Sequence, residues 1–189
     1  FSSCICICRY SSAVNLFMII RDNLEHCAEI SNGQTLMLLQ KEIKQVFRKY
    51  ADEVAVKLPK EVPIDGLREK DVRVACYVVN TGAYCAETVP KVANIVVRLI
   101  QEPFKEHIDM EAETEYFYDM LSAAIKILIE HIMAKCGPSF VDMTRVNWAN
   151  IEDVGDSSPY TSKIKTILQV CLLFGDRGVH IRAVTLQLT

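Results

Sequence analysis

The chain has 189 residues and a formal net charge of −3; half of its residues are hydrophobic and 24% are charged. This length is enough for one domain, or two small ones, with a sizeable buried core. The negative charge and the lack of a polybasic run exclude the basic surface of a nucleic-acid-binding protein and direct binding to anionic lipid. The longest uncharged runs, residues 10–20 and 74–86, are shorter than the ~18 apolar residues of a membrane-spanning helix. The start has no signal-peptide pattern, so we expect a soluble cytosolic protein.

The chain contains eight cysteines, which we expect to be reduced because no secretion signal is present. Cys4, Cys6 and Cys8 form a C-x-C-x-C run, which lacks the paired C-x₂₋₄-C spacing of structural zinc. The other five lie in helical apolar patterns, where a free thiol behaves as a small apolar side chain: Cys27, Cys76, Cys85, Cys136 and Cys171. We therefore predict no metal site and no cofactor.

Two amphipathic helices are predicted near the start, over residues 13–30 and 35–58, where apolar residues recur at i, i+3 and i+4. Ser12 is the expected N-cap of the first, and Asn32-Gly33 is expected to end it in a left-handed conformation. The short link between them predicts an antiparallel helical hairpin. Residues 1–12 are predicted to be a disordered or non-native extension, although the alternation of Ile5 and Ile7 is also compatible with a short strand.

Residues 59–70 contain two prolines and a glycine and are predicted to form a loop. The next helical pattern, residues 71–101, keeps its phase across Pro90, so we expect a bent helix and not two separate ones. Gly82 lies within the same pattern and is unfavourable in a helix interior by about 1 kcal/mol relative to alanine.

After a break at residues 103–109, residues 110–136 form the clearest helical pattern. Three glutamates crowd its first turns and are expected to be solvated there, where they complement the helix dipole: Glu111, Glu113 and Glu115. Gly137-Pro138 is expected to end this helix. A last helix is predicted to begin with Ser158 as N-cap and Pro159 at its first position. The fold class is therefore all-α, with long antiparallel amphipathic helices forming a bundle or part of a helical rod.

Catalytic motifs are not found: the sequence has no G-x-S-x-G, no nucleotide-binding loop and no H-E-x-x-H. Two Cys–His neighbours exist, but His26 and Cys27 point in different directions on a helix. His131 and Cys136 are five positions apart, about 140° around the helix axis. We therefore predict that the chain is not an enzyme.

The segment from Asp142 to Thr161 contains the single tryptophan and resembles the W-x-N-x-E-x-V-G-D-x-S-P-Y signature of the vacuolar protein sorting-associated protein 53 family. The matching positions are Trp148, Asn150, Glu152, Val154, Gly155, Asp156, Ser158, Pro159 and Tyr160. Two upstream runs agree with it. One matches at Thr81, Tyr84 and Cys85, although Ala83 replaces the usual acid, and the other matches at Phe47, Lys49 and Tyr50.

The resemblance covers roughly residues 13–167. It predicts a helical tether-subunit region over residues 13–168 and a divergent C-terminal tail over residues 169–189. Neither Trp148 nor the other signature positions form a catalytic motif, so we expect them to be structural or to lie at an interface. For Trp148 a core position is favoured over an anchor for a partner, because Val146 and Ile151 flank it.

The resemblance implies a non-catalytic subunit of the Golgi-associated retrograde protein (GARP) and endosome-associated recycling protein (EARP) tethering complexes. These complexes capture vesicles in retrograde transport from endosomes to the trans-Golgi network and in endosomal recycling. The implied partners are other tether subunits, SNARE proteins and small GTPases, and the implied location is peripheral on trans-Golgi network and endosome membranes. The alternative is a generic helical protein–protein adaptor unrelated to vesicle tethering.

Overall fold

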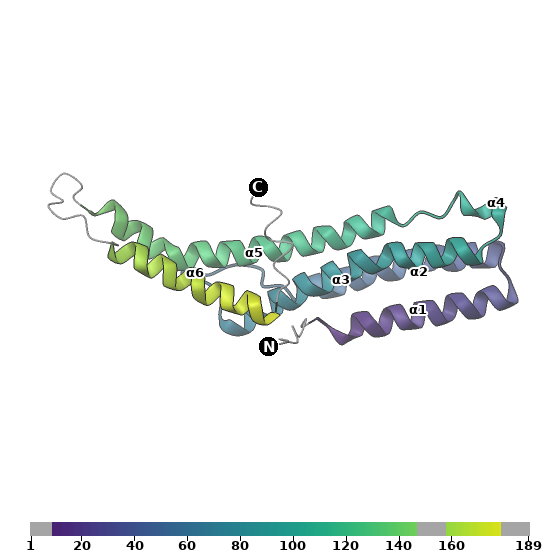
Figure 1. Cartoon of the computed structure of the whole chain (residues 1–189), viewed down its shortest axis with the longest axis horizontal. Helices are drawn as coiled ribbons and strands as arrows, with labels where there is room; N and C mark the ends of the chain where they lie inside the picture. Colours follow the sequence, from purple (N-terminus) through teal and green to yellow (C-terminus); the bar gives the residue numbers. More distant parts are fainter. Residues whose placement is uncertain (1–8, 147–157, 179–189) are drawn as a thin grey trace, which may run out of the picture.

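The computed structural model describes residues 9–146 and 158–178, of which residues 170–178 are described by their backbone alone. Every regular element in these ranges is a helix, so the predicted all-α fold is confirmed (Figure 1). The helices are α1 Ser11–Ile30, α2 Gln34–Ala55, α3 Glu69–Leu99, α4 Glu102–Lys105, α5 Glu111–Thr144 and α6 Pro159–Gly178. Trp148 and the signature positions up to Asp156 lie outside the described residues.

The long helices lie lengthwise beside one another, and consecutive ones run in opposite directions (Figure 1). α1, α2, α3 and the first half of α5 form a bundle. The second half of α5 extends past the other three helices, at the left of the figure, and α6 packs against it there. The molecule is therefore a thick bundle at one end and a thinner pair of helices at the other.

Aromatic side chains from the apolar stripes join the bundle at its centre. The ring of Phe47 on α2 lies 5.3 Å from that of Phe17 on α1 and 6.1 Å from that of Phe117 on α5, between ring centroids. Tyr84 on α3 meets Phe17 edge-on at 5.6 Å. Such tilted and edge-to-face pairs are the preferred aromatic geometries. Each of these four helices therefore contributes a ring at the centre of the bundle.

Gly82 lies where α3 crosses α5 at close range. A Cβ atom at this position would stand 3.0 Å from Cβ of Leu121 and 3.3 Å from the carbonyl oxygen of Phe117. The glycine therefore permits the contact between the two helices, which offsets its unfavourable helix propensity. α3 also runs unbroken through Pro90, whose ring is exposed, and this confirms a single helix there.

The predicted helix end at Gly137-Pro138 is wrong, because α5 continues to Thr144. An internal proline costs about 3 kcal/mol, but the turns on either side of it are held by tertiary contacts. Cys136 and Ser139 are buried, and Asp142 accepts a 2.9 Å hydrogen bond from Lys163 of α6. Packing against α6 therefore stabilises the turns that local sequence alone would end.

Two predicted features of the first hairpin are also wrong. Ser12 lies inside α1, not at its N-cap, and its hydroxyl is hydrogen-bonded to that of Tyr50 at 2.9 Å. Gly33 has a φ of −105°, so the exit from α1 is not left-handed. The connection is instead held from outside, because Asn32 accepts hydrogen bonds from both the backbone and the side chain of Gln101.

Candidate functional site: the outer face of α5 and the groove beside it

The described residues that carry the family resemblance fall on three helices, with Phe47, Lys49 and Tyr50 on α2. Tyr84 and Cys85 lie on α3, whereas Pro159 and Tyr160 begin α6. The Tyr84 ring is half-buried between Phe17 and the guanidinium of Arg9, which stands 4.2 Å from its centroid. Pro159 occupies the first position of α6, as predicted.

The thiols on α3 are not suited to nucleophilic chemistry. Burial raises the pKa of Cys85 to about 12 and that of Cys76 to about 11, so both stay protonated near neutral pH. In the part of the chain that the structure describes, no three His, Cys, Asp or Glu side chains gather closely enough to hold a metal ion. No helix in the same part is long and apolar enough to cross a membrane.

The prediction that all three glutamates at the start of α5 are solvated is wrong for one of them. Glu111 and Glu115 are exposed as expected, but Glu113 is 0% exposed. Its Oε1 accepts hydrogen bonds of 2.9 and 2.7 Å from Nε and Nη2 of Arg48. Nζ of Lys44 lies 3.3 Å from Oε2, at ion-pair distance but without hydrogen-bond geometry. Glu113 stands four residues before Phe117 on the apolar stripe, which is the sequence signal that predicts its inward position.

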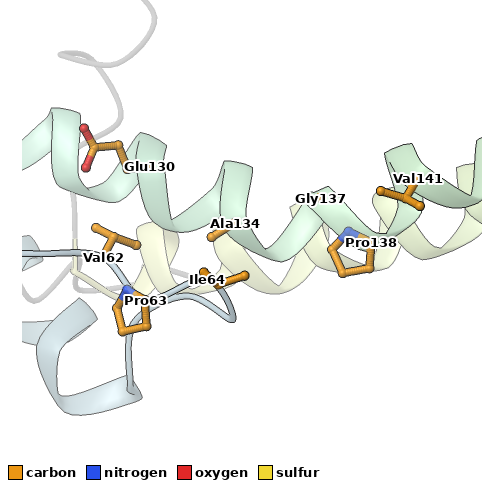
Figure 2. A pocket seen from close by; sticks show the side chains of 8 residues that line it. All are labelled: Val62, Pro63, Ile64, Glu130, Ala134, Gly137, Pro138 and Val141. Atoms are coloured by element: carbon orange, nitrogen blue, oxygen red, sulfur yellow. The ribbon is translucent and has the colours of Figure 1, made fainter.

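A groove of about 610 Å³ lies between the α2–α3 connection and the second half of α5 (Figure 2). Its lining is apolar apart from one carboxylate and the backbone: Val62, Pro63, Ile64, Glu130, Ala134, Gly137, Pro138 and Val141. The connection supplies one wall and α5 the other. The side chain of Ile64, at the tip of the connection, is 97% exposed. An open apolar groove with a single charged group is suited to an apolar side chain from another polypeptide.

The groove continues onto an exposed apolar surface of α5, which we call the α5 face. It consists of Ile129, Met133, Phe140, Val141 and Met143. Spacings of 3, 4 and 7 residues place Ile129, Met133, Phe140 and Met143 on one side of a helix, and Val141, about 100° from Phe140, joins them to the groove that it lines. Asp142, which contacts α6, is two positions from Phe140 and therefore about 200° away around the helix. Contact with α6 at Asp142 leaves Met133 and Phe140 exposed, but the buried Cys136 is four positions before Phe140 on the same side of α5, so the α5 face borders a covered position.

The wall of the groove formed by the connection is held by a turn and by a histidine. The turn is closed by a hydrogen bond of 2.8 Å from the Gly66 N–H to the Pro63 carbonyl oxygen. The next N–H, that of Leu67, donates to Nδ1 of His131 on α5, also at 2.8 Å. Leu67 itself is buried. The position of Val62, Pro63 and Ile64 beside α5 therefore depends on His131.

This architecture, helices packed around one core with apolar side chains exposed on the longest of them, defines an all-α helical-bundle protein. Known proteins that are similar to the chain include the following two. Vacuolar protein sorting-associated protein 53 A of Arabidopsis thaliana is 33% identical over 169 residues, which are 84% of this chain and 20% of the relative. A vacuolar protein sorting-associated protein 53 homolog of Caenorhabditis elegans is 26% identical over 99 residues, 51% of this chain and 11% of the relative.

The chain belongs to the vacuolar protein sorting-associated protein 53 family, and it spans about a fifth of the length of the Arabidopsis relative. No family model and no solved structure matches it. The resemblance inferred from the tryptophan-containing signature is thereby confirmed at the level of the family.

Proposed function

We propose that this chain is a non-catalytic part of a subunit of a multisubunit vesicle-tethering complex, and that it acts by assembly with other proteins. Membership of the vacuolar protein sorting-associated protein 53 family supports the biological setting. The observation that carries the assembly role is the α5 face. Contiguous exposed apolar patches are rare on soluble monomeric proteins, and the larger ones usually mark interaction sites.

The pattern of α5 supports the same conclusion. From Phe117 onward its apolar residues are spread around the whole helix, and a helix of this kind is normally buried on all sides. The bundle buries one side, with Met120, Leu121 and Ile125 in the core. Beyond residue 129 the side chains of the α5 face are exposed, with Met133 at 55%. A further protein element that covers the α5 face would bury the apolar side chains that remain exposed on this helix.

The finer assignment is a role in endosome-to-trans-Golgi retrograde transport and in endosomal recycling, as part of the GARP and EARP complexes. In this setting the α5 face contacts another tether subunit or a further helical segment. SNARE proteins and small GTPases are the other partners of this assignment, and association with trans-Golgi network and endosome membranes is peripheral, through the complex. The competing assignment is a helical adaptor that binds proteins outside vesicle tethering.

Co-expression with the sister tether subunits of the same organism tests the proposal. We expect at least one sister subunit to co-purify with the chain, and Met133→Glu to reduce its recovery by about tenfold or more, as for the loss of an interface hot spot. Ile19→Glu is the matched control, since Ile19 is also apolar and 59% exposed but lies on α1. Equal recovery with Met133→Glu and with native chain would refute the role of the α5 face. Binding to none of the sister subunits would refute the tether assignment and leave the adaptor.

A further inference from the structure

His131 is a buried histidine whose hydrogen bond can exist in only one protonation state. It is 8% exposed, and its Nδ1 accepts the Leu67 N–H at 2.8 Å. An accepting Nδ1 carries no proton, so the ring is neutral and its proton resides on Nε2. In the imidazolium form both ring nitrogens are donors, and two N–H groups would then face each other across this distance.

The backbone at Gly66 lies close to the ring of His131. Gly66 has a φ of +84°, the left-handed region that favours glycine. A Cβ atom on Gly66 would stand 2.8 Å from Nδ1 and 3.2 Å from Cε1 of His131. The connection thus lies close against the imidazole, and a movement of the chain around Gly66 and Leu67 would relieve a repulsion at Nδ1. The Gly66 N–H also closes the turn to Pro63, so such a movement is transmitted to the groove wall.

The charged groups around His131 do not favour its protonation. On α5 itself, Lys135 lies one helical turn after His131. Its Cε atom is close to Gly66, since it would stand 3.0 Å from a Cβ atom added to that glycine. Burial, followed by the positive charge of Lys135, lowers the pKa of His131 below 6.5. On the connection and the start of α3, Asp65 and Glu69 are exposed, and Arg68 is paired with Asp71 at 2.9 Å. On α6, Lys163 is paired with Asp142. Among the described residues no carboxylate pairs with the ring.

We propose that His131 is a proton-sensitive latch: neutral, it holds the α2–α3 connection on α5 through the Leu67 N–H, and protonated, it releases the connection and with it the wall of the groove. The latch is a property of this chain alone. Only its consequence for partner binding rests on the function proposed above.

Hydrogen exchange of the Leu67 amide in the 189-residue chain, followed by NMR between pH 7.5 and 5.5, tests the latch. After correction for the intrinsic exchange rate, we expect the protection of Leu67 to fall by about tenfold per pH unit as the pKa of His131 is approached. The titration of the His131 ring, read from its Cε1–H shift, should have the same midpoint as the loss of protection. Amides in the α1–α2–α3 core serve as the internal reference and should keep their protection.

His131→Asn separates protonation from structure, because the asparagine carbonyl oxygen can accept the Leu67 N–H but does not titrate. We expect Leu67 to remain protected in this variant down to pH 5.5. His107→Asn is the matched control, since His107 is an exposed histidine after α4, and it should behave as the native chain. Leu67 protection that is independent of pH in the native chain, or equally pH-dependent in His131→Asn, would overturn the latch. Because no partner is present, neither result depends on whether the α5 face binds another protein.

Discussion

The contrast between two glycines in helix interiors provides a sharp test of how tertiary packing overrides local propensity. Gly82 on α3 and Gly137 on α5 have the same intrinsic cost, and replacing either by alanine should gain up to about 1 kcal/mol from propensity alone. At Gly137 no atom outside its chain neighbours lies within 4 Å of the new Cβ. The preceding-proline restriction from Pro138 reduces the gain there, so Gly137→Ala should be neutral to stabilising by about 1 kcal/mol.

At Gly82 the same methyl group meets α5. It would lie 3.0 Å from Cβ of Leu121, 3.1 Å from Cε of Met120 and 3.3 Å from the carbonyl oxygen of Phe117. The methionine tip can rotate away, but the other two atoms belong to the frame of α5, so the helices must separate. Overpacking of this kind costs about 1–3 kcal/mol. After subtraction of the propensity gain, Gly82→Ala should destabilise the fold by about 1 kcal/mol.

Urea unfolding followed by far-UV circular dichroism measures both variants against the native chain. The expected result is a lower midpoint for Gly82→Ala, an unchanged or higher midpoint for Gly137→Ala, and equal slopes. If Gly82→Ala raised the midpoint as much as Gly137→Ala, the close approach of α3 and α5 at Gly82 would be refuted.

Three further outcomes follow from the buried polar groups. Arg48→Met should lower the free energy of unfolding by about 2–3 kcal/mol, because it leaves the fully buried Glu113 carboxylate with Lys44 as its remaining cation. In urea titrations, the double variant Arg48→Met/Glu113→Met should lose clearly less unfolding free energy than the sum of the losses of the two single variants. The lowered pKa of His131 means that the unfolded chain binds this proton more readily than the folded one, so stability should fall as pH drops below 6.5 towards the folded-state pKa, and His131→Asn should flatten this part of the pH profile measured by thermal unfolding. Cys85, buried and with its pKa raised to about 12, should resist a thiol reagent at pH 7.5 until urea unfolds the chain; rapid labelling in the native state would contradict its position in the core.

The sequence by itself determined the fold class and most of the helices. Apolar residues at a 3.6-residue period require a helix to bury them together, and this requirement is local, so it can be detected without knowing the partner helices. The stripe through Phe47, for example, predicted a helix over residues 35–58, and α2 spans Gln34–Ala55. The tryptophan-containing signature likewise determined the family, because it depends only on residue identity and spacing.

Only the tertiary structure decided the features that depend on contacts between residues distant in the sequence. Gly137-Pro138 has the local pattern of a helix end, but burial of Cys136 and Ser139 continues α5 to Thr144. In the sequence, Glu113 has the position of a solvated glutamate that complements the helix dipole. Its burial is possible because Arg48 of α2 donates hydrogen bonds to its carboxylate. Leu67 and His131 are 64 positions apart, and their hydrogen bond exists because α5 folds back along the α2–α3 connection. Contacts between distant segments set the energies of these groups, and no periodicity within one segment encodes them.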